Sequence, residues 1–431
     1  MICDNLSVNS KGTLCFAGYD TVELAEKYGT PAYIMDEGKI REKCRIYKTA
    51  MQKYLGDGSF PLFASKSLCF KHIYKIIKEE NLGIDVVSSG EIFTANKAGF
   101  PMEKAFFHGN NKTDFDVSFA MDNKVGYFVC DNENELETIN RIALKKNIKQ
   151  KVILRLTPGI DPHTHQKIST GNIDSKFGNA IETGQALKLF KAAISKENVC
   201  LKGFHCHIGS QIFDCEPFCD AAVIMTDFVL KVKNEFGFKT EILNLGGGMG
   251  VKYVETDPDI DYVQNIKRIA EIIKRKCEEN GIEMPAVLME PGRSIVADAG
   301  LTLYTVGDRK EIPGFKNYVS VDGGMSDNPR YTLYQSDYTV MLANKADKKS
   351  DYLCTVAGRC CESGDLLQEN VKLPYPEKGD ILAVLTTGAY NYSMSSNYNA
   401  ICKPPVIMLN SDGDYAAVRR ETFEDMLTCQ L

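Results

Sequence analysis

Short apolar runs alternate with longer segments of helix-like pattern between residues 60 and 290. Each run has the length of a buried strand, and a segment such as 260–279 carries apolar residues three and four apart, as one face of a helix does. Eight strand and helix units in succession predict a (β/α)8 barrel of the TIM type. The runs lie at 60–66, 82–87, 105–108, 127–130, 151–156, 201–207, 241–245 and 286–290.

The composition of the chain changes after about residue 295. This part is rich in Val, Tyr, Thr and Gly, with short runs such as YVSVDGG and DILAVLTTGAY, which predicts an all-β domain. The stretch AYIMD, before the first barrel strand, is expected to join that domain. We therefore expect an α/β protein with an N-terminal segment (1–36) that completes the β domain, a barrel (37–295) and a C-terminal β domain (296–431).

The charge and the cysteine pattern exclude several classes of protein. A formal net charge of −6 argues against a general binder of nucleic acid or of anionic membranes, so the expected partner is a small molecule. The longest uncharged stretch, 381–402, is rich in Asn, Ser, Thr and Tyr and is not expected to cross a bilayer. The start, MICDNLSVNSKG, lacks the pattern of a secretory signal. The fifteen cysteines include no CxxC unit, which predicts reduced thiols in a cytoplasmic protein and no metal site.

Polar side chains and a glycine run follow the predicted strands, where barrel enzymes place their reacting groups. Asp131 is followed by NENE and is predicted to be a helix N-cap. Lys66, His207 and Glu290 have no such local role. The residues at the strand ends are Lys66, Asp85, His108, Asp131, Arg155, His207, Gly246 and Glu290.

Lys66 lies in the stretch PLFASKSLCF, residues 61–70, which otherwise resembles a buried strand. In one interpretation the strand has ended and the lysine points into water, as most lysines do. In the other, partial desolvation lowers the pKa of the amine, so that its neutral form can make a Schiff base with a carbonyl. This stretch by itself leaves both interpretations open.

Two glycine-containing loops follow later strands of the predicted barrel. NLGGGMG (244–250) could point backbone amides at a phosphate or could form a tight turn, and HIGSQ (207–211) leaves the same choice open for Ser210. EPGRS (290–294) follows the eighth strand, beside the usual phosphate site of a barrel. A lysine for an aldehyde, glycine amides for a phosphate, a carboxylate for a ring nitrogen and a histidine to cover the ring together indicate pyridoxal phosphate.

The chain resembles the diaminopimelate decarboxylases, a family in the alanine-racemase-like group (fold type III) of pyridoxal-phosphate enzymes. The resemblance covers nearly the whole chain and keeps the order of ten stretches. These are FASKS, DVVSSGE (85–91), TPGIDPHTH (157–165), STGNIDSKFG (169–178), HCHIGSQ (205–211), NLGGGMG, EPGRSIVA (290–297), DGGMSDNPRY (322–331), CCESGD (360–365) and GAYNYSMSSNYN (388–399).

The resemblance implies a set of cofactor contacts. Lys66 would carry pyridoxal phosphate as a Schiff base, Glu290 would pair with the pyridine nitrogen and keep it protonated, and His207 would stack on the ring. Asp85 would lie beside the lysine and tune it. The contacts implied around the phosphate and the rest of the cofactor are Ser210, Gly247, Gly248, Pro291, Gly292, Arg293 and Tyr390.

The substrate contacts that the resemblance implies lie mostly in the β domain. Arg293, Arg330 and Tyr334 would bind the distal carboxylate of meso-diaminopimelate, since a planar guanidinium suits two-point recognition of a carboxylate. Glu362 would bind the distal ammonium, and Tyr390 would reach the same region. The implied reaction releases carbon dioxide and L-lysine, as the last step of lysine biosynthesis.

The stretch CCESGD implies a shared active site. In the family, the cysteine and the glutamate of this stretch are contributed by the other subunit, so the expected active unit is a homodimer. Cys361, the cysteine directly before ESGD, would donate a proton to the carbon that loses carbon dioxide. Cys360 makes a CC pair here, so this assignment rests on aligning Cys361 with the family's cysteine.

Two other kinds of enzyme share some of these sequence features. The pairs His163/His165 and His205/His207 could suggest a barrel metallohydrolase, but all six histidines precede residue 208 and none lies on the last two strands. Related decarboxylases act on ornithine, arginine or carboxynorspermidine, whose far ends lack a second amino-acid head. The combination of NPRY and CESGD favours diaminopimelate.

Overall fold

The computed structural model describes residues 1–160 and 176–431. The chain divides into two compact units, which we call the barrel unit and the sheet unit. The barrel unit comprises Lys43–Gly250 and Ile260–Gly292, and the sheet unit comprises Met1–Glu42, Val251–Asp259 and Arg293–Leu431. His163, His165 and most of the stretches TPGIDPHTH and STGNIDSKFG lie outside the described residues.

Eight parallel strands among the described residues of the barrel unit form a closed ring. Each strand pairs with the next, and the pairing of β8 with β9 closes the ring in register Phe128 to Val152. The predicted TIM-type barrel is confirmed, and every predicted strand lies within two residues of an observed one. The strands are β5 (Phe60–Ala64), β6 (Gly83–Val86), β7 (Ala105–Phe107), β8 (Tyr127–Cys130), β9 (Gln150–Thr157), β11 (Val199–His205), β12 (Ile242–Asn244) and β13 (Ala286–Met289); β10 (Asn179–Ala180) pairs with β9.

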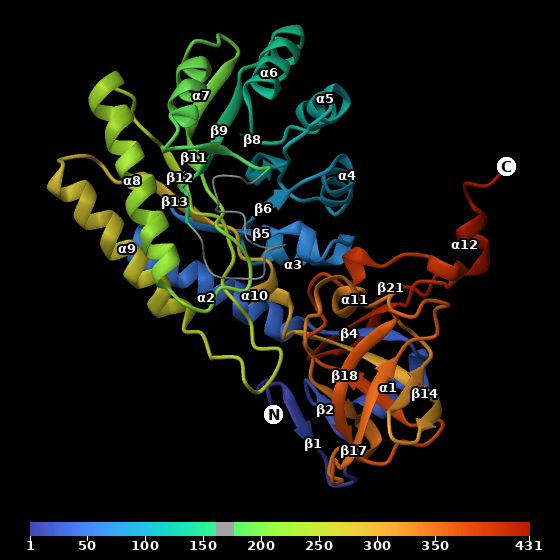
Figure 1. Ribbon diagram of the computed structural model, residues 1–431. Helices are drawn as coiled ribbons and strands as arrows, with labels where there is room; N and C mark the ends of the chain where they lie inside the picture. The colour runs from blue at the N-terminus through green and yellow to red at the C-terminus, as the bar shows by residue number, and fades with distance from the viewer. Residues whose placement is uncertain (161–175) are drawn as a thin grey trace. The chain divides into compact units, whose positions relative to one another are not determined.

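Helices lie outside the ring of strands (Figure 1). Helix α9 shows why they form: Asp261 accepts a hydrogen bond from the amide of Gln264, and the buried residues, such as Ile266, Ile269 and Ile273, recur three and four apart. The helices are α2 (Glu37–Leu55), α3 (Lys71–Glu79), α4 (Ser89–Lys97), α5 (Asp114–Asp122), α6 (Glu133–Lys146), α7 (Gln185–Ile194), α8 (Glu216–Phe236) and α9 (Tyr262–Glu279); 3-10 turns are η1 (Ser65–Ser67) and η2 (Met102–Lys104).

The predicted helix cap at Asp131 is wrong. Asn132, one residue later, caps α6 by accepting a hydrogen bond from the amide of Glu135. The Asp131 carboxylate instead accepts a hydrogen bond from the amide of Gly178 at 2.9 Å and lies 3.9 Å from the guanidinium of Arg155. Asp131 therefore ties the end of β8 to the chain that follows β9.

Apolar side chains from six of the barrel strands, one from each, pack in a buried cluster. Each of these side chains is at most 8% exposed, so its apolar surface is almost entirely removed from water. Burying one such leucine or isoleucine stabilises the fold by about 1.5–3 kcal/mol. They are Leu62, Phe106, Val129, Ile153, Ile242 and Leu288. The packed interior leaves the carboxyl ends of the strands as the place for polar groups.

The sheet unit joins both ends of the chain in one sheet. Strand β4 (Ala32–Asp36), which contains AYIMD, is buried throughout and pairs antiparallel with β14 and parallel with β20, with Met35 opposite Gly300 and Met408. The predicted completion of the β domain by the N-terminal segment is confirmed. The strands are β14 (Gly300–Ile312), β15 (Lys316–Val321), β16 (Val340–Leu342), β17 (Tyr352–Ala357), β18 (Leu366–Leu373), β19 (Ile381–Val384), β20 (Val406–Asn410) and β21 (Gly413–Val418).

The core of the sheet unit draws on the same two ends of the chain. Leu14 and Phe16 pack in one apolar cluster with Leu301, Leu303 and Ile407. The shorter elements of the unit are β1 (Leu6–Val8), β2 (Leu14–Phe16), β3 (Tyr19–Asp20), α1 (Thr21–Tyr28), α10 (Arg293–Val296), α11 (Arg330–Tyr334), α12 (Phe423–Leu427), η4 (Ala343–Lys345), η5 (Tyr392–Met394) and η6 (Tyr398–Ala400). No helix among the described residues is both long and apolar enough to span a membrane.

Candidate active site

Lys66 lies in a turn just beyond its barrel strand. Strand β5 ends at Ala64, and Lys66 is the middle residue of η1, exposed between two buried serines. The hydroxyl of Ser67 donates to the carbonyl of Ala64 at 2.7 Å, which holds the turn against the strand end. Lys66 interacts electrostatically with Asp85, and its positive charge also acts on His207. The amine is thus both accessible and surrounded by polar groups at the carboxyl end of the barrel.

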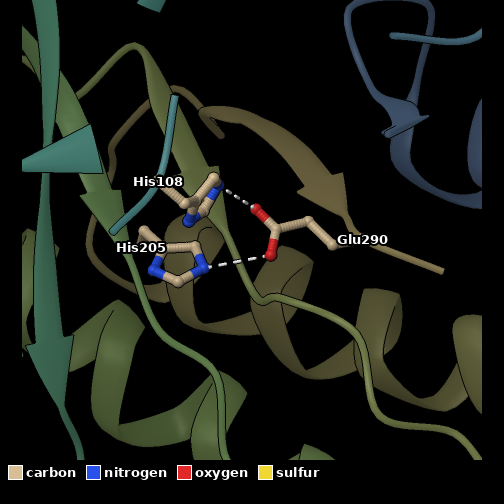
Figure 2. A group of neighbouring side chains, drawn as sticks. All are labelled: His108, His205 and Glu290. Atoms are coloured by element: carbon tan, nitrogen blue, oxygen red, sulfur yellow. Dashed lines mark hydrogen bonds and ion pairs between the residues drawn. The ribbon is translucent and has the colours of Figure 1, made fainter. Parts of the chain in front are cut away.

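Glu290 follows β13 and is the centre of a buried polar cluster (Figure 2). Its Oε1 accepts a hydrogen bond from Asn244 Nδ2 at 2.7 Å and lies 2.9 Å from His108 Nε2. Its Oε2 lies 3.2 Å from His205 Nε2. Asp85 Oδ1 lies 3.8 Å from His108 Nε2. Four carboxyl ends of strands, those of β7, β11, β12 and β13, therefore meet at one carboxylate.

The surroundings shift the pKa values of the two carboxylates of this cluster in opposite directions. Burial alone would raise the pKa of Glu290, but His108 and His205 lower it well below its usual range. Burial raises the pKa of Asp85, although His108 and Lys66 partly oppose the rise. Burial also lowers the pKa of His205 to about 4. The cluster thus keeps Glu290 ionised and His205 neutral near pH 7.

The glycine-containing loops after β11 and β12 are held together by backbone contacts. The amide of Ile212 donates to the carbonyl of Gly248 at 3.0 Å, and a Cβ on Gly248 would lie 2.3 Å from the carbonyl oxygen of Gly209. A Cβ on Gly247 would lie 2.0 Å from the carbonyl oxygen of Glu290. These glycines are therefore required by close packing against backbone carbonyls, a reason that differs from the phosphate site and the tight turn between which the sequence left the choice open. Ser210 lies in the same loop and is half-buried.

His207 is linked to the glycine-rich loop. Its Nδ1 accepts a hydrogen bond from the amide of Gly247 at 3.3 Å. Burial lowers the pKa of His207 well below its usual value, and the positive charges of Lys66 and Arg155 lower it further. A neutral imidazole in a fixed orientation suits stacking on a planar ring. In this structure the Gly247 amide is engaged by His207.

The stretch EPGR passes close to the turn that carries Lys66. The amide of Ala64 donates to the carbonyl of Pro291 at 3.1 Å. A Cβ on Gly292 would lie 2.9 Å from Cβ of Ala64 and 3.1 Å from Oγ of Ser67. A larger residue at 292 would push the two segments apart, so the glycine fixes the distance between the Lys66 turn and the chain after Glu290.

Within the sheet unit, two buried arginines lie around one tyrosine ring. The guanidinium carbons of Arg293 and Arg330 lie 4.8 and 5.5 Å from the ring centre of Tyr390. Arg293 Nη1 donates to the hydroxyl of Tyr253 at 2.8 Å, and Arg330 lies 5.3 Å from the ring centre of Tyr334. Tyr390 has a φ of +63°, which is unusual for a residue with a side chain and common at functional sites.

Arg330 carries a charge that the described residues do not neutralise. It is 7% exposed, and its Nη2 lies 3.4 Å from Oγ of Ser336. No ion pair joins Arg330 to an acidic residue in the described ranges, and the nearby carboxylate of Asp327 accepts instead from the hydroxyl of Tyr304 at 2.5 Å. A buried guanidinium of this kind is suited to bind an anionic group of a ligand.

The stretch CCESGD presents one thiol and conceals the other. Cys361 and Glu362 are exposed, whereas Cys360 is buried and burial raises the pKa of its thiol. The buried carboxylate of Asp365 accepts hydrogen bonds from the amides of Met325 and Cys360, at 2.5 and 2.6 Å. This carboxylate joins CCESGD to the stretch DGGMSDNPRY, so the two stretches keep a fixed relation.

Comparisons with known proteins agree with these features. The family described as "Pyridoxal-dependent decarboxylase, pyridoxal binding domain" matches residues 37–297. The diaminopimelate decarboxylase of Bacillus methanolicus is 44% identical over 414 residues, which cover 96% of this chain and 96% of that protein. The chain belongs to the diaminopimelate decarboxylase family. The Staphylococcus aureus (strain COL) member is 44% identical over 420 residues, which cover 97% of this chain and 98% of that protein.

Solved structures of this family share the fold of the chain. The diaminopimelate decarboxylase of M. jannaschii, in co-complex with L-lysine, is 34% identical, with a TM-score of 0.91 and coverage of 99% of this chain and 98% of that chain. The family accounts for the pyridoxal-type features of the barrel unit: a lysine just after β5, a buried ionised carboxylate after β13 and a neutral histidine after β11. These residues fit the chemistry of pyridoxal phosphate, which needs an amine and a partner for its ring nitrogen.

Several residues of the site were missed or left without a role in the sequence interpretation. His205 lies two residues before His207, and Asn244 directly precedes LGGGMG, but nothing in the sequence shows that both reach Glu290. Glu91 is the last residue of DVVSSGE; it accepts a hydrogen bond from the amide of Val87 at 2.6 Å, and burial raises its pKa to about 7. Position in the family's stretches was the available signal for Glu91 and for Asp365.

Proposed function

We propose that this chain is a cytoplasmic, homodimeric enzyme that uses pyridoxal phosphate to decarboxylate meso-diaminopimelate, giving L-lysine and carbon dioxide. The observation that carries the proposal is the pair of buried arginines, Arg293 and Arg330, in a chain whose barrel has the lysine, carboxylate and histidine of a pyridoxal site. A buried guanidinium suits the distal carboxylate of a substrate with a second amino-acid head. The diaminopimelate decarboxylase structures from M. jannaschii and Helicobacter pylori in complex with L-lysine support the same product.

The barrel unit would hold the cofactor. Lys66 would bond to its aldehyde, Glu290 would hold a proton on the ring nitrogen, and His207 would cover the ring. Bound pyridoxal phosphate supplies an electron sink for the pair of electrons that carbon dioxide leaves behind. The phosphate would be held by Ser210, by the loop residues Gly247, Gly248, Pro291 and Gly292, and by Arg293 and Tyr390. Asp85 would adjust the charge around Lys66.

The sheet unit would supply the contacts to the substrate. Arg330, Arg293 and Tyr334 would bind the distal carboxylate, with the ring of Tyr390 between the two guanidinium groups. Glu362 is exposed. In the proposed dimer it would extend into the active site of the other subunit and bind the distal ammonium there. Cys361 would hold the proton that is delivered to the carbon from which carbon dioxide has left.

The proposal is tested by identifying the product. Purified protein supplied with pyridoxal phosphate is offered meso-diaminopimelate, ornithine, arginine and carboxynorspermidine separately, and products are identified by mass spectrometry. We expect lysine and carbon dioxide in equal amounts from diaminopimelate and much slower reaction with the other three. Preferential decarboxylation of any of those three would contradict the assignment of the substrate. A protein that binds pyridoxal phosphate and decarboxylates none of the four would contradict the proposed function itself.

Replacement of Arg330 by alanine should affect substrate choice more than cofactor binding. Loss of one charge-assisted hydrogen bond costs about 1.5–3 kcal/mol, so kcat/KM for meso-diaminopimelate should fall by roughly ten- to a few-hundred-fold. Arg309→Ala is a matched control, because Arg309 also lies over a tyrosine ring, 4.2 Å from that of Tyr375, and has no proposed role. Unchanged kinetics in Arg330→Ala would remove Arg330 from the site, and loss of the fold or of cofactor binding would indicate a structural role.

A further inference from the structure

The Glu290 carboxylate has more hydrogen-bond partners than pairing with a ring nitrogen requires. An ionised carboxylate has about four acceptor positions, two on each oxygen. Asn244 Nδ2 lies 2.7 Å from Oε1. Figure 2 shows the two imidazole rings, with His108 Nε2 2.9 Å from Oε1 and His205 Nε2 3.2 Å from Oε2. Three protein nitrogens therefore lie close to the carboxylate, and only that of His205 lies at Oε2. The printed geometry makes hydrogen bonds of the Asn244 and His205 contacts, whereas His108 Nε2 has the distance of an ion pair without a hydrogen bond among the described residues.

The direct partners of Glu290 are imidazole and amide groups, not ammonium or guanidinium groups. Arg155 acts on Glu290 through its charge, but no ion pair joins the two among the residues described, and Arg155 lies 3.9 Å from Asp131. This choice of partners has a consequence. A hydrogen bond from the neutral His205 ring or from the Asn244 amide stabilises the ionised carboxylate, whereas a bonded ammonium or guanidinium would also cancel its charge. The carboxylate keeps its negative charge for a cationic group of the ligand.

The state of His205 follows from its surroundings. Burial lowers its pKa to about 4, so the ring is neutral near pH 7. Its Nδ1 is buried and has no hydrogen-bond partner among the described residues, while its Nε2 faces an ionised carboxylate. The proton of the neutral ring therefore belongs on Nε2. The rings of His205 and His108 lie edge to face, with centres 4.9 Å apart, which fixes the orientation of both.

We propose that His108 and His205 are positioning residues that hold Glu290 ionised and directed, so that it keeps the cofactor's ring nitrogen protonated. This inference rests on the proposed function, because it takes the ring nitrogen of pyridoxal phosphate as the ligand of Glu290. The two histidines do not touch the reacting atoms. They act through the carboxylate, and their loss should change the proton affinity of the carboxylate before it changes the fold.

The first test compares the acid limb of the pH profile of kcat/KM between the wild type and a variant without the two imidazoles. Removing the N–H groups leaves burial, which raises the pKa of Glu290, so the carboxylate becomes protonated at the acid end of the range and activity is lost at a higher pH than in the wild type. The double variant His108→Ala/His205→Ala should shift the acid limb of kcat/KM, and the matching change in cofactor absorbance, upward by roughly one to two pH units, the effect of losing one charge-assisted hydrogen bond.

The controls separate this role from a structural one. The double variant His108→Gln/His205→Gln keeps an N–H donor at each position. It should return the acid limb of kcat/KM and the absorbance change towards the wild-type pH. His72→Ala, at a half-buried residue of α3 outside the Glu290 cluster, should shift neither the acid limb nor the absorbance change. The inference would be overturned by an alanine double variant that binds the cofactor and shows neither a shifted acid limb of kcat/KM nor a shifted absorbance change. If the wild type forms no lysine at all, the proposed function fails first, and the two failures are distinguishable.

A second measurement uses the unmodified protein and does not depend on the folding of a variant. In protein labelled with ¹⁵N-histidine, we expect the His205 ring to stay neutral between pH 6 and 8, with its proton on Nε2, because burial lowers its pKa to about 4. A proton on Nδ1, or titration of this ring above pH 6, would contradict the inference. So would one equivalent of zinc in the purified protein, because His108, His205 and Glu290 also have the donor types of a metal site.

Discussion

Replacement of Lys66 by alanine should abolish the reaction and leave the fold intact. The proposed chemistry requires a covalent link between this amine and the cofactor, and removal of a covalent catalytic group lowers kcat by roughly three orders of magnitude or more. Lys66 is exposed in its turn, so the free energy of unfolding should change by no more than about 0.5 kcal/mol. The measurements are kcat for meso-diaminopimelate and the Tm of the same preparation.

Lys71→Ala is the matched control for this prediction. Lys71 is exposed at the first position of α3, five residues beyond Lys66, and has no proposed role. Its loss should change neither kcat nor Tm appreciably. Activity in Lys66→Ala comparable with that of the control would show that the aldehyde is held elsewhere. A large fall in Tm in Lys66→Ala alone would show instead that the lysine supports the turn after β5.

Replacement of Cys361 by alanine should lower kcat by about 10²- to 10⁴-fold, the usual contribution of a positioned acid or base. Cys361 is exposed and its backbone amide donates to Oδ1 of Asn399 at 2.7 Å, so its alanine variant should fold normally. Cys360→Ala is the matched control: its thiol is buried, and its loss should lower the Tm more than kcat. The opposite pattern would assign the proton donor to Cys360.

Mixing two inactive proteins tests the shared site. A Lys66→Ala chain and a Cys361→Ala chain are each inactive, but a mixed dimer with shared sites has one site in which both residues are intact. With random exchange, about a quarter of the wild-type activity should return, because half of the dimers are mixed and each has one working site. No return of activity despite demonstrated exchange of subunits would mean that each chain builds its own site.

The barrel could be predicted from the sequence because its strands leave a strong local signal. A strand such as β9 is almost wholly buried, so an apolar run marks it within two residues. Strand β4 was expected in the β domain because AYIMD precedes the first barrel strand, although its partners lie more than 260 residues away. Local capping was harder to place: Asp131 and Asn132 both have cap-forming side chains, and only the backbone conformation decides which residue is the cap.

The site was harder to predict because its residues meet only after folding. His205 and Glu290 are separated by 85 positions, and neither a strand pattern nor a helix pattern relates them. Residues 251–259 belong to the sheet unit without forming a helix or a strand, yet Tyr253 from this segment contacts Arg293. The glycines at 247 and 248 were visible in the sequence, but their reason, the close approach of the carbonyls of Glu290 and Gly209, required the structure.

The central claim, that the barrel carries pyridoxal phosphate on Lys66, is tested most directly by borohydride reduction of the protein with its cofactor, followed by proteolysis and mass spectrometry. Reduction makes the link between lysine and cofactor permanent, so the labelled peptide identifies the lysine. We predict one pyridoxyl group per chain, on the peptide that contains FASKS, at Lys66. A label on a different lysine, or a protein that takes up no pyridoxal phosphate, would contradict the account.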